Sequence, residues 1–323
     1  IISDQFTFYD NIISGNSAGG SGGGMHLQDG TDQTILHSCL FSGNLANTGA
    51  GIYAINFDGS FINFTVAANR SLANGGGIAN NSSNSLIKNA IIYGNTSVPA
   101  ATAAFYNVAS TPDVDYSLVQ GGYVGTRNIN VNPLFVSQAS AAAAPTIAGD
   151  YQLQKCSPAL NAGRNGYLPA GILRDVIYNP RVNYGTVEMG AYEMQLQFAV
   201  PNGSGIVYVD NTKSGNGNSW ANAVPELANA LIAAKYNSSI TQIWISKGTY
   251  KPIYNPEDST ALDCNATDRN IAFSLVSGVK VYGGFAGGET LLSQRNVSAN
   301  TVTLSGDIGA VGVTTDNCYH VVI

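Results

Sequence analysis

The N-terminal third of the chain alternates between short apolar runs and clusters of glycine, asparagine and serine. The apolar runs are rich in β-branched and aromatic side chains, as in 52–55 and 61–64. Runs this short cannot form helices and predict β-strands separated by tight turns. The pattern therefore predicts an all-β fold.

The apolar runs recur with a regular period that four asparagines mark. Asn16, Asn44, Asn69 and Asn95 lie 28, 25 and 26 residues apart, and each opens the phrase N-x-A-x-x-G-G-G-[IM] or a variant of it. A short apolar pair precedes each asparagine. A fixed period in this range predicts a solenoid in which each repeat contacts only its neighbours.

Each repeat has room for three short strands and three turns, which predicts a right-handed parallel β-helix. Successive coils would then pair strand on strand, about 4.8 Å apart. Ile52, Ile78 and Phe105 are expected in one internal column. The four asparagines are expected to form a structural ladder, because stacked amide side chains hydrogen-bond to the amides above and below them. Asparagine also tolerates the left-handed backbone region, and the glycine cluster permits a tight turn.

The rhythm breaks after residue 119, which suggests that the chain holds two solenoids. Residues 1–196 are predicted to be the C-terminal coils of a β-helix with an irregular segment as its closing cap, since a solenoid must cover its last apolar layer. Residues 197–205 read as a linker. Residues 206–323 are predicted to be the N-terminal cap and first coils of a second β-helix.

The second half of the chain contains one helical pattern among several strand patterns. A helix is expected after Pro225, with an apolar stripe at Leu227, Ala230, Leu231 and Ala234. Strands are expected at 206–209, 242–245, 278–282, 301–304 and 320–323. One helix followed by successive strands is the arrangement expected of a starting cap.

Several short motifs resemble those of bacterial right-handed β-helix surface proteins. The segments 208–210, 219–221 and 243–250 resemble the opening segment of such proteins, and 282–285, 289–290 and 293–295 resemble the next coil in surface proteins of Bacteroidetes-type bacteria. The phrases 41–44 and 75–78 are similar to the FxxN and GG[AI] repeats of polymorphic outer-membrane proteins. The copy at 67–69 lacks the phenylalanine, and the copy at 95–105 lacks the glycines. The resemblance implies an extracellular β-helix and identifies no activity.

Composition narrows the classes of partner. Only 11% of the residues are charged and the formal net charge is −6, with no basic patch, so nucleic-acid binding is not expected. No apolar run approaches the roughly 18 residues that a membrane span needs. Ile1 lies in mid-pattern, so we expect the chain to be a piece of a longer protein. Low charge and many amides are common in secreted β-rich proteins, so an extracellular or cell-surface location is expected.

The four cysteines form no metal-binding pattern. Cys39, Cys156, Cys264 and Cys318 are far apart, and no C-x-x-C pair occurs. Cys39 is expected to act as a small buried apolar residue. An extracellular location would permit a disulfide between Cys264 and Cys318, which the sequence alone does not establish.

Acidic residues give little sign of a catalytic site, which in a glycosidase needs two facing carboxylates. Turns are the expected environment of 29–32 and of Asp58, with a weak calcium site as the alternative. A structural turn is likewise expected at Asp113 and Asp115. His26, His37 and His320 lack metal-ligand spacing and are expected at the surface or at strand edges.

Two further features give no predicted binding site. The glycine-rich segment 283–288 lacks the Lys-Ser/Thr of a phosphate-binding loop. Four tyrosines could stack on sugar rings, but their offsets from the asparagines differ, which predicts that they do not share one column. These residues are Tyr9, Tyr53, Tyr93 and Tyr106. No catalytic, cofactor-binding or metal-binding residue is assigned, and no cofactor is expected.

The expected function is a non-catalytic structural or adhesive segment of a large bacterial surface or secreted fibre protein. Its partners would be unidentified glycans or proteins of a cell surface or matrix. One alternative is a carbohydrate-active enzyme, a polysaccharide lyase or glycosidase, or a sugar-binding module. Another is a filament subunit that associates end to end, because exposed coil ends are unpaired sheet edges.

Overall fold

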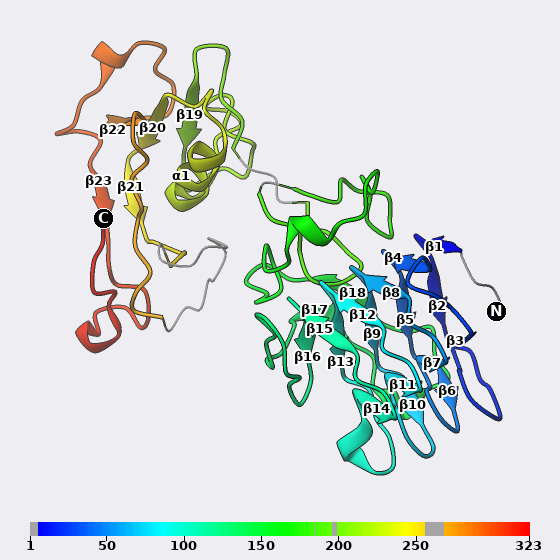
Figure 1. The fold of residues 1–323 in the computed structure, drawn as a ribbon. Coiled ribbons are helices and arrows are strands. Elements are labelled where there is room, and N and C mark those ends of the chain that lie inside the picture. Colours follow the sequence, from blue (N-terminus) through cyan, green and yellow to red (C-terminus); the bar gives the residue numbers. More distant parts are fainter. Residues whose placement is uncertain (1–5, 184, 196–198, 256–267) are drawn as a thin grey trace. The chain divides into compact units, whose positions relative to one another are not determined.

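The computed structural model describes residues 6–183, 185–195, 199–255 and 268–323, and the chain forms two compact units (Figure 1). The first unit is Ile1–Gln195 and the second is Leu196–Ile323. Each unit is described separately below.

The first unit is a parallel β-solenoid of about four turns. Its coils stack into three parallel sheets, which we call sheets A, B and C. Sheet A contains β3 (Met25–Gln28), β7 (Ile52–Ile55), β11 (Ile78–Asn81) and β14 (Phe105–Val108). Sheet B contains β1 (Thr7–Tyr9), β4 (Ile35–His37), β8 (Ser60–Ile62), β12 (Leu86–Lys88) and β15 (Asp113–Asp115). Sheet C contains β2 (Ile12–Ser14), β5 (Leu40–Ser42), β9 (Thr65–Ala67), β13 (Ile91–Tyr93) and β16 (Leu118–Val119).

Shorter elements complete the first unit. The strands β6 (Leu45–Ala46) and β10 (Arg70–Ser71) pair in parallel at the turn between sheets C and A. The strands β17 (Phe135–Ser137) and β18 (Asp150–Leu153) form an antiparallel pair. Three single-turn 3₁₀ helices are η1 (Ala100–Thr102), η2 (Ala141–Ala143) and η3 (Asn165–Tyr167).

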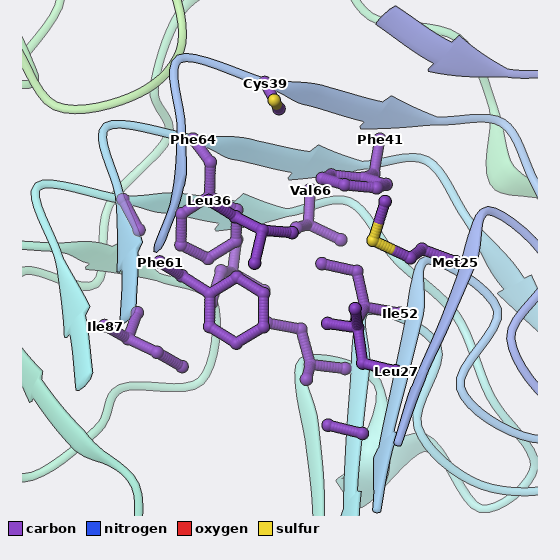
Figure 2. Close-up of a cluster of buried hydrophobic side chains, with 14 of the residues drawn as sticks. Met25, Leu27, Leu36, Cys39, Phe41, Ile52, Phe61, Phe64, Val66 and Ile87 are labelled. Atoms are coloured by element: carbon purple, nitrogen blue, oxygen red, sulfur yellow. The ribbon is translucent and has the colours of Figure 1, made fainter. Parts of the chain in front are cut away.

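The core lies inside the coil, between the three sheets. Ile78 pairs with Ile52 on one side and with Phe105 on the other, which confirms the predicted internal column, and Met25 extends it. Figure 2 shows side chains from all three sheets directed into this interior, among them Leu27, Phe61 and Phe41. Each of these three is completely buried. Because no single coil can bury such residues, stacking of neighbouring coils provides the apolar stabilisation.

Sheet C differs from sheet A because its strands are apolar on both faces. Phe41 and Ile92 point into the core, while Leu40 and Ile91, on the outer face, are also almost fully buried. A strand buried on both faces loses the apolar–polar alternation of a half-exposed strand. Another part of the chain must therefore cover the outer face of sheet C.

The segment that covers sheet C was expected to be an end cap. Residues 133–183 and 185–195, which we call the return segment, instead run along the side of the solenoid and contact successive coils. The backbone N–H of Thr146 donates to Gly43 O at 2.8 Å, and that of Ala191 donates to Thr65 Oγ1 at 2.9 Å. The N–H of Gly190 donates to Asn89 O at 2.8 Å. The prediction of a cap was wrong for this segment because the exposed apolar surface lies along sheet C and not only at its end.

A shorter segment lies at the end of the last coil. Ile129 forms a parallel bridge with Leu118, and Asn128 Oδ1 accepts from the N–H of Ser117 at 3.0 Å. The ring of Tyr123 lies 4.9 Å from that of Phe105. The residues just after β16 therefore perform part of the closing role expected of the whole segment up to 196.

The second unit combines parallel strands with one helix. A three-stranded parallel sheet has the order β19 (Ile206–Val209), β20 (Gln242–Ser246), β22 (Lys280–Phe285). The strands β21 (Gly248–Tyr250) and β23 (Val302–Leu304) form a parallel pair. The helices are α1 (Leu227–Tyr236), η4 (Leu292–Gln294) and η5 (Thr314–Asp316). The predicted helix is confirmed, and its apolar stripe is buried against the sheet.

Two sequence expectations for the second half differ from the structure, and one disulfide that the sequence left open is not formed. Residues 320–323 form no strand and contribute only an isolated bridge between Val322 and Phe273. The described part of the expected linker, 199–205, packs on the second unit, where Ala199 is buried in the core. Cys318 is a buried free thiol, so it forms no disulfide with Cys264, which itself lies outside the described residues.

Candidate functional site

The four asparagines lie in single file at the turn that follows sheet C. Asn16 Nδ2 donates to Asn44 Oδ1 at 3.0 Å, Asn44 Nδ2 donates to Asn69 Oδ1 at 2.9 Å, and Asn69 Nδ2 donates to Asn95 Oδ1 at 2.9 Å. Each Oδ1 also accepts the backbone N–H of the preceding asparagine, at 2.9 to 3.0 Å. One amide oxygen per coil therefore joins two neighbouring coils.

Burial shows what this asparagine ladder does. Asn44 and Asn69 have no exposed surface and Asn95 is 3% exposed, whereas Asn16 in the first described coil is exposed. The second amide hydrogen of Asn69 donates to Phe41 O, and that of Asn95 to Val66 O, both at 2.9 Å. Buried amides with all these partners stabilise the coil and have no surface with which to contact a ligand.

A cationic side chain on the outer face of sheet B binds two carboxylates. Lys88 Nζ lies 2.8 Å from Asp113 Oδ1 and 2.7 Å from Asp115 Oδ2. The expected structural turn at Asp113 and Asp115 was wrong: both belong to strand β15, which places their side chains on one face beside Lys88 of β12. The hydroxyl of Tyr167 also donates to Asp115 Oδ2, at 3.2 Å.

The electrostatics of this group are those of a stable ion pair. Burial opposes charge on Lys88, but hydrogen bonds to Asp113 and Asp115 outweigh it, and the pKa of Lys88 is raised. Burial likewise opposes charge on Asp115, yet the contact with Lys88 dominates and its pKa is lowered. A general acid or base needs a pKa near the working pH, and both groups move away from that range.

The return segment contains a buried charge cluster that the sequence did not predict. Arg181 is wholly enclosed, and its guanidinium donates to Ala191 O at 2.8 Å and Gly190 O at 2.9 Å. Its carboxylate partner is Glu193, with Arg181 Nη2 to Glu193 Oε2 at 3.5 Å. Glu188 lies in the same enclosure and accepts the N–H of Met194 at 2.9 Å. The only sequence signal was the clustering of these charges within 13 residues of a chain poor in charge.

Burial shifts the pKa values of this cluster. It raises the pKa of Glu193 to about 7 and that of Glu188 well above its usual value, with the mutual repulsion of the two carboxylates adding to the Glu188 shift. Burial and the charge of Arg181 lower the pKa of His37 to about 4. His37 stacks on Tyr9 and is only 7% exposed. It was expected at the surface or at a strand edge, and the expectation of a surface position was wrong because the side chain is buried.

The outer face of sheet A carries an aromatic column. Backbone register pairs His26 with Tyr53, Tyr53 with Ala79, and Ala79 with Tyr106, so all four lie in one file. The prediction that the tyrosines share no column was therefore wrong for Tyr53 and Tyr106, although Tyr9 and Tyr93 belong to other sheets. The rings of His26 and Tyr53 are 5.0 Å apart.

The glycine-rich segment of the second unit binds a carboxylate of its own chain. Glu289 accepts the backbone N–H groups of Ala286, Gly287 and Gly288 at 2.6, 3.0 and 3.0 Å. Burial alone would raise the pKa of Glu289, but these three donors lower it. The segment is an anion-binding turn whose anion is supplied internally.

The remaining candidates are turn residues. Asp29 has a left-handed φ of 55° and accepts from the side chains of Gln28 and Asn56. Asp58 Oδ1 accepts the N–H of Asn84 at 2.7 Å. Within residues 6–183, 185–195, 199–255 and 268–323, no three His, Cys, Asp or Glu side chains are grouped as metal ligands.

Neither the helices nor the comparisons add a functional assignment. Among the helices that the structure describes, none is both long and apolar enough to cross a bilayer. No protein-family model matches this sequence, and the searches of curated proteins and of solved structures found no match.

Proposed function

We propose that this chain is a non-catalytic structural segment of an extracellular surface or secreted fibre protein. The observation that carries the proposal is the asparagine ladder, in which three consecutive amide–amide hydrogen bonds of 2.9 to 3.0 Å join four coils. A solenoid built this way resists separation of its coils, which is the mechanical demand on a fibre.

The return segment supports the same role. It lies along sheet C, and its backbone N–H groups donate to several coils, to the carbonyls of Gly43 and Asn89 and to the hydroxyl of Thr65. Pulling one coil away from its neighbour would break the ladder, the strand pairing and these side contacts together. Cooperative contacts of this kind favour a segment that transmits force.

The charged side chains also favour a structural role over an enzymatic one. The two carboxylates on the outer face of β15 share Lys88 as their cation. Glutamates 188 and 193 are enclosed with Arg181, at 2% and 3% exposure. Each of these groups is engaged by its own chain, so a bound polysaccharide would have to displace an existing partner before chemistry could begin.

Single-molecule pulling on the full chain tests the proposal. We expect the first unit to unfold in one high-force event, and the Asn69→Ala variant to unfold at clearly lower force. A parallel assay would measure reducing ends released from plant and bacterial polysaccharides. Release that disappears in Asp115→Asn would show an enzyme, and low-force, stepwise unfolding of the parent chain would contradict the structural role.

A further inference from the structure

The outer face of sheet A faces solvent. In this it differs from the outer face of sheet C, which the return segment covers. Its outward positions are His26, Gln28, Tyr53, Ile55, Ala79, Asn81, Tyr106 and Val108, and we call this set the tyrosine face. The inward neighbours on the same strands, such as Leu27 and Ile52, are fully buried in the core. The outward residues are half-exposed or exposed, except for Ala79.

We propose that the tyrosine face binds an uncharged glycan chain. This site goes beyond the structural role and does not depend on it, because a fibre segment can carry force whether or not one of its faces binds a ligand.

The spacing of the rings favours an extended ligand. Tyr53 and Tyr106 lie two strands apart, about 9.6 Å along the solenoid axis, and His26 extends the file to about 14 Å. Ala79, which carries only a methyl group, separates the two tyrosines. A file of rings this long suits a short run of sugar units better than one compact ligand.

The turn beside the column contributes backbone alone. Gly49 and Gly75 have left-handed φ values of 62° and 70°. A Cβ on Gly49 would lie 2.9 Å from Tyr53 Cβ, and one on Gly75 would lie 2.8 Å from Ala79 Cβ. Glycine is therefore required at both positions, and the close backbone forms a wall along one side of the aromatic file.

The chemistry of the face favours a neutral ligand. None of its eight outward positions carries Lys, Arg, Asp or Glu, so it offers no ion pair to an acidic sugar. Tyrosine presents an apolar ring with a polar hydroxyl, which matches the apolar faces and hydroxyl edges of a pyranose. Gln28 and Asn81 add amides in the neighbouring column, and amides donate to and accept from hydroxyl groups.

The charge that follows the face in sequence is already engaged. Asp29 follows Gln28 at the end of β3, and its two carboxylate oxygens accept from Gln28 Nε2 at 3.0 Å and Asn56 Nδ2 at 3.1 Å. This contact orders the edge of the face without making it a cation site, which leaves ring stacking and hydroxyl hydrogen bonds as the means of recognition.

Affinity electrophoresis of the full chain tests the proposal. Native gels would contain xylan, hydroxyethylcellulose or mannan as neutral polymers, and polygalacturonate as the charged one. We expect a neutral polymer to retard the protein, with affinity about fivefold to tenfold weaker for each ring removed in Tyr53→Ala and Tyr106→Ala. The matched control is Tyr9→Ala, which removes a 54% exposed tyrosine from sheet B and should leave retardation unchanged.

A second variant guards against loss of folding. Asn81→Arg keeps both rings and places a long, hydrated side chain on the same face, so it should also weaken retardation, by obstructing the ligand, while circular dichroism stays unchanged. The proposal is overturned if no neutral polymer retards the protein, if polygalacturonate is preferred, or if Tyr9→Ala weakens retardation as much as Tyr53→Ala or Tyr106→Ala does. A dimer in sedimentation that Asn81→Arg dissociates would show that a second copy occupies the face, and would overturn it too.

Discussion

The asparagine ladder makes a quantitative prediction for the substitution Asn69→Ala. The side chain of Asn69 takes part in four hydrogen bonds in the middle of the file. Its Oδ1 accepts from the backbone N–H and from Nδ2 of Asn44, and its Nδ2 donates to Asn95 Oδ1 and Phe41 O, all at 2.9 Å. Alanine removes all four.

The cost follows from the number of these bonds and from the burial of the groups left behind. Each hydrogen bond contributes about 1 kcal/mol net, and an orphaned buried group costs about 1–3 kcal/mol. The N–H of Asn44 becomes such a group, because Asn44 has no exposed surface. We therefore expect Asn69→Ala to lower the free energy of unfolding of the first unit by roughly 4 kcal/mol.

Asn16→Ala is the matched control. Asn16 is exposed, and its side chain makes one ladder bond, to Asn44 Oδ1 at 3.0 Å, and one longer bond to Ser14 O at 3.3 Å. Water can replace both partners, so the expected loss is about 1 kcal/mol or less. The contrast between two identical substitutions separates the effect of the buried ladder from that of amide loss in general.

Urea unfolding measures both variants with an internal reference. Both tryptophans, Trp220 and Trp244, belong to the second unit, so their fluorescence reports on that unit, whereas far-ultraviolet circular dichroism also reports on the solenoid. Asn69→Ala should shift the solenoid transition and leave the tryptophan transition in place. Equal midpoints for Asn69→Ala and Asn16→Ala would refute the role assigned to the ladder.

Further predictions concern coil spacing and pH. Gly51→Ala would place Cβ 2.5 Å from the carbonyl oxygen of Gly77 and should cost about 1–3 kcal/mol in thermal unfolding, whereas Gly19→Ala, which meets nothing within 4 Å, should be neutral. The pKa of His37 is lowered from 6.5 to about 4, so its contribution to stability is present above pH 6.5 and lost as the pH falls toward 4. His37→Gln should therefore lose less stability than the parent between pH 7 and 5 in urea titrations; an equal loss would contradict this. The pKa of Glu193 is raised from 4.5 to about 7, so its contribution to stability is lost as the pH rises through that window. In the same titrations, Glu193→Gln should therefore lose less stability than the parent when the pH rises from about 5 to about 7.

The internal columns were predictable because they depend on local repetition. The same phrase after the same apolar pair gives the same turn, and the inward position that follows it must be apolar in every coil. Ile52, Ile78 and Phe105 obey this rule and pair as predicted. The amphipathic helix in the second unit was predictable for the same reason, since its stripe at Leu227 and Leu231 is a local pattern.

The tyrosine column was missed because turn length varies. Tyr53 follows its asparagine by nine residues and Tyr106 by eleven, which in sequence looks like two different positions. Strand register is set by backbone hydrogen bonds after the turn, so the turn absorbs the difference and both residues reach the same file. Counting from the nearest paired strand would have found the column.

The return segment and its charges were missed for a different reason. The apolar outer face of sheet C, at Leu40 and Ile91, shows that a cover is needed but does not say which part of the chain provides it. Long-range packing brings Arg181, the partner of Glu193, close enough to His37 to act on its charge, and no spacing along the chain encodes that approach. Likewise, Asp113 and Asp115 became recognisable as strand residues only beside Lys88 of the previous coil.

The most direct test of the stacked ladder is hydrogen exchange of the asparagine side chains. In protein labelled with ¹⁵N-asparagine, nuclear magnetic resonance resolves the side-chain amides, and single Asn→Asp variants would assign those of Asn44 and Asn69. Both are fully buried, and each donates two hydrogen bonds through Nδ2, so their signals should persist in deuterated water long after that of exposed Asn16 has vanished. Exchange of Asn44 and Asn69 as rapid as that of Asn16 would contradict the stacking of these coils through their asparagines.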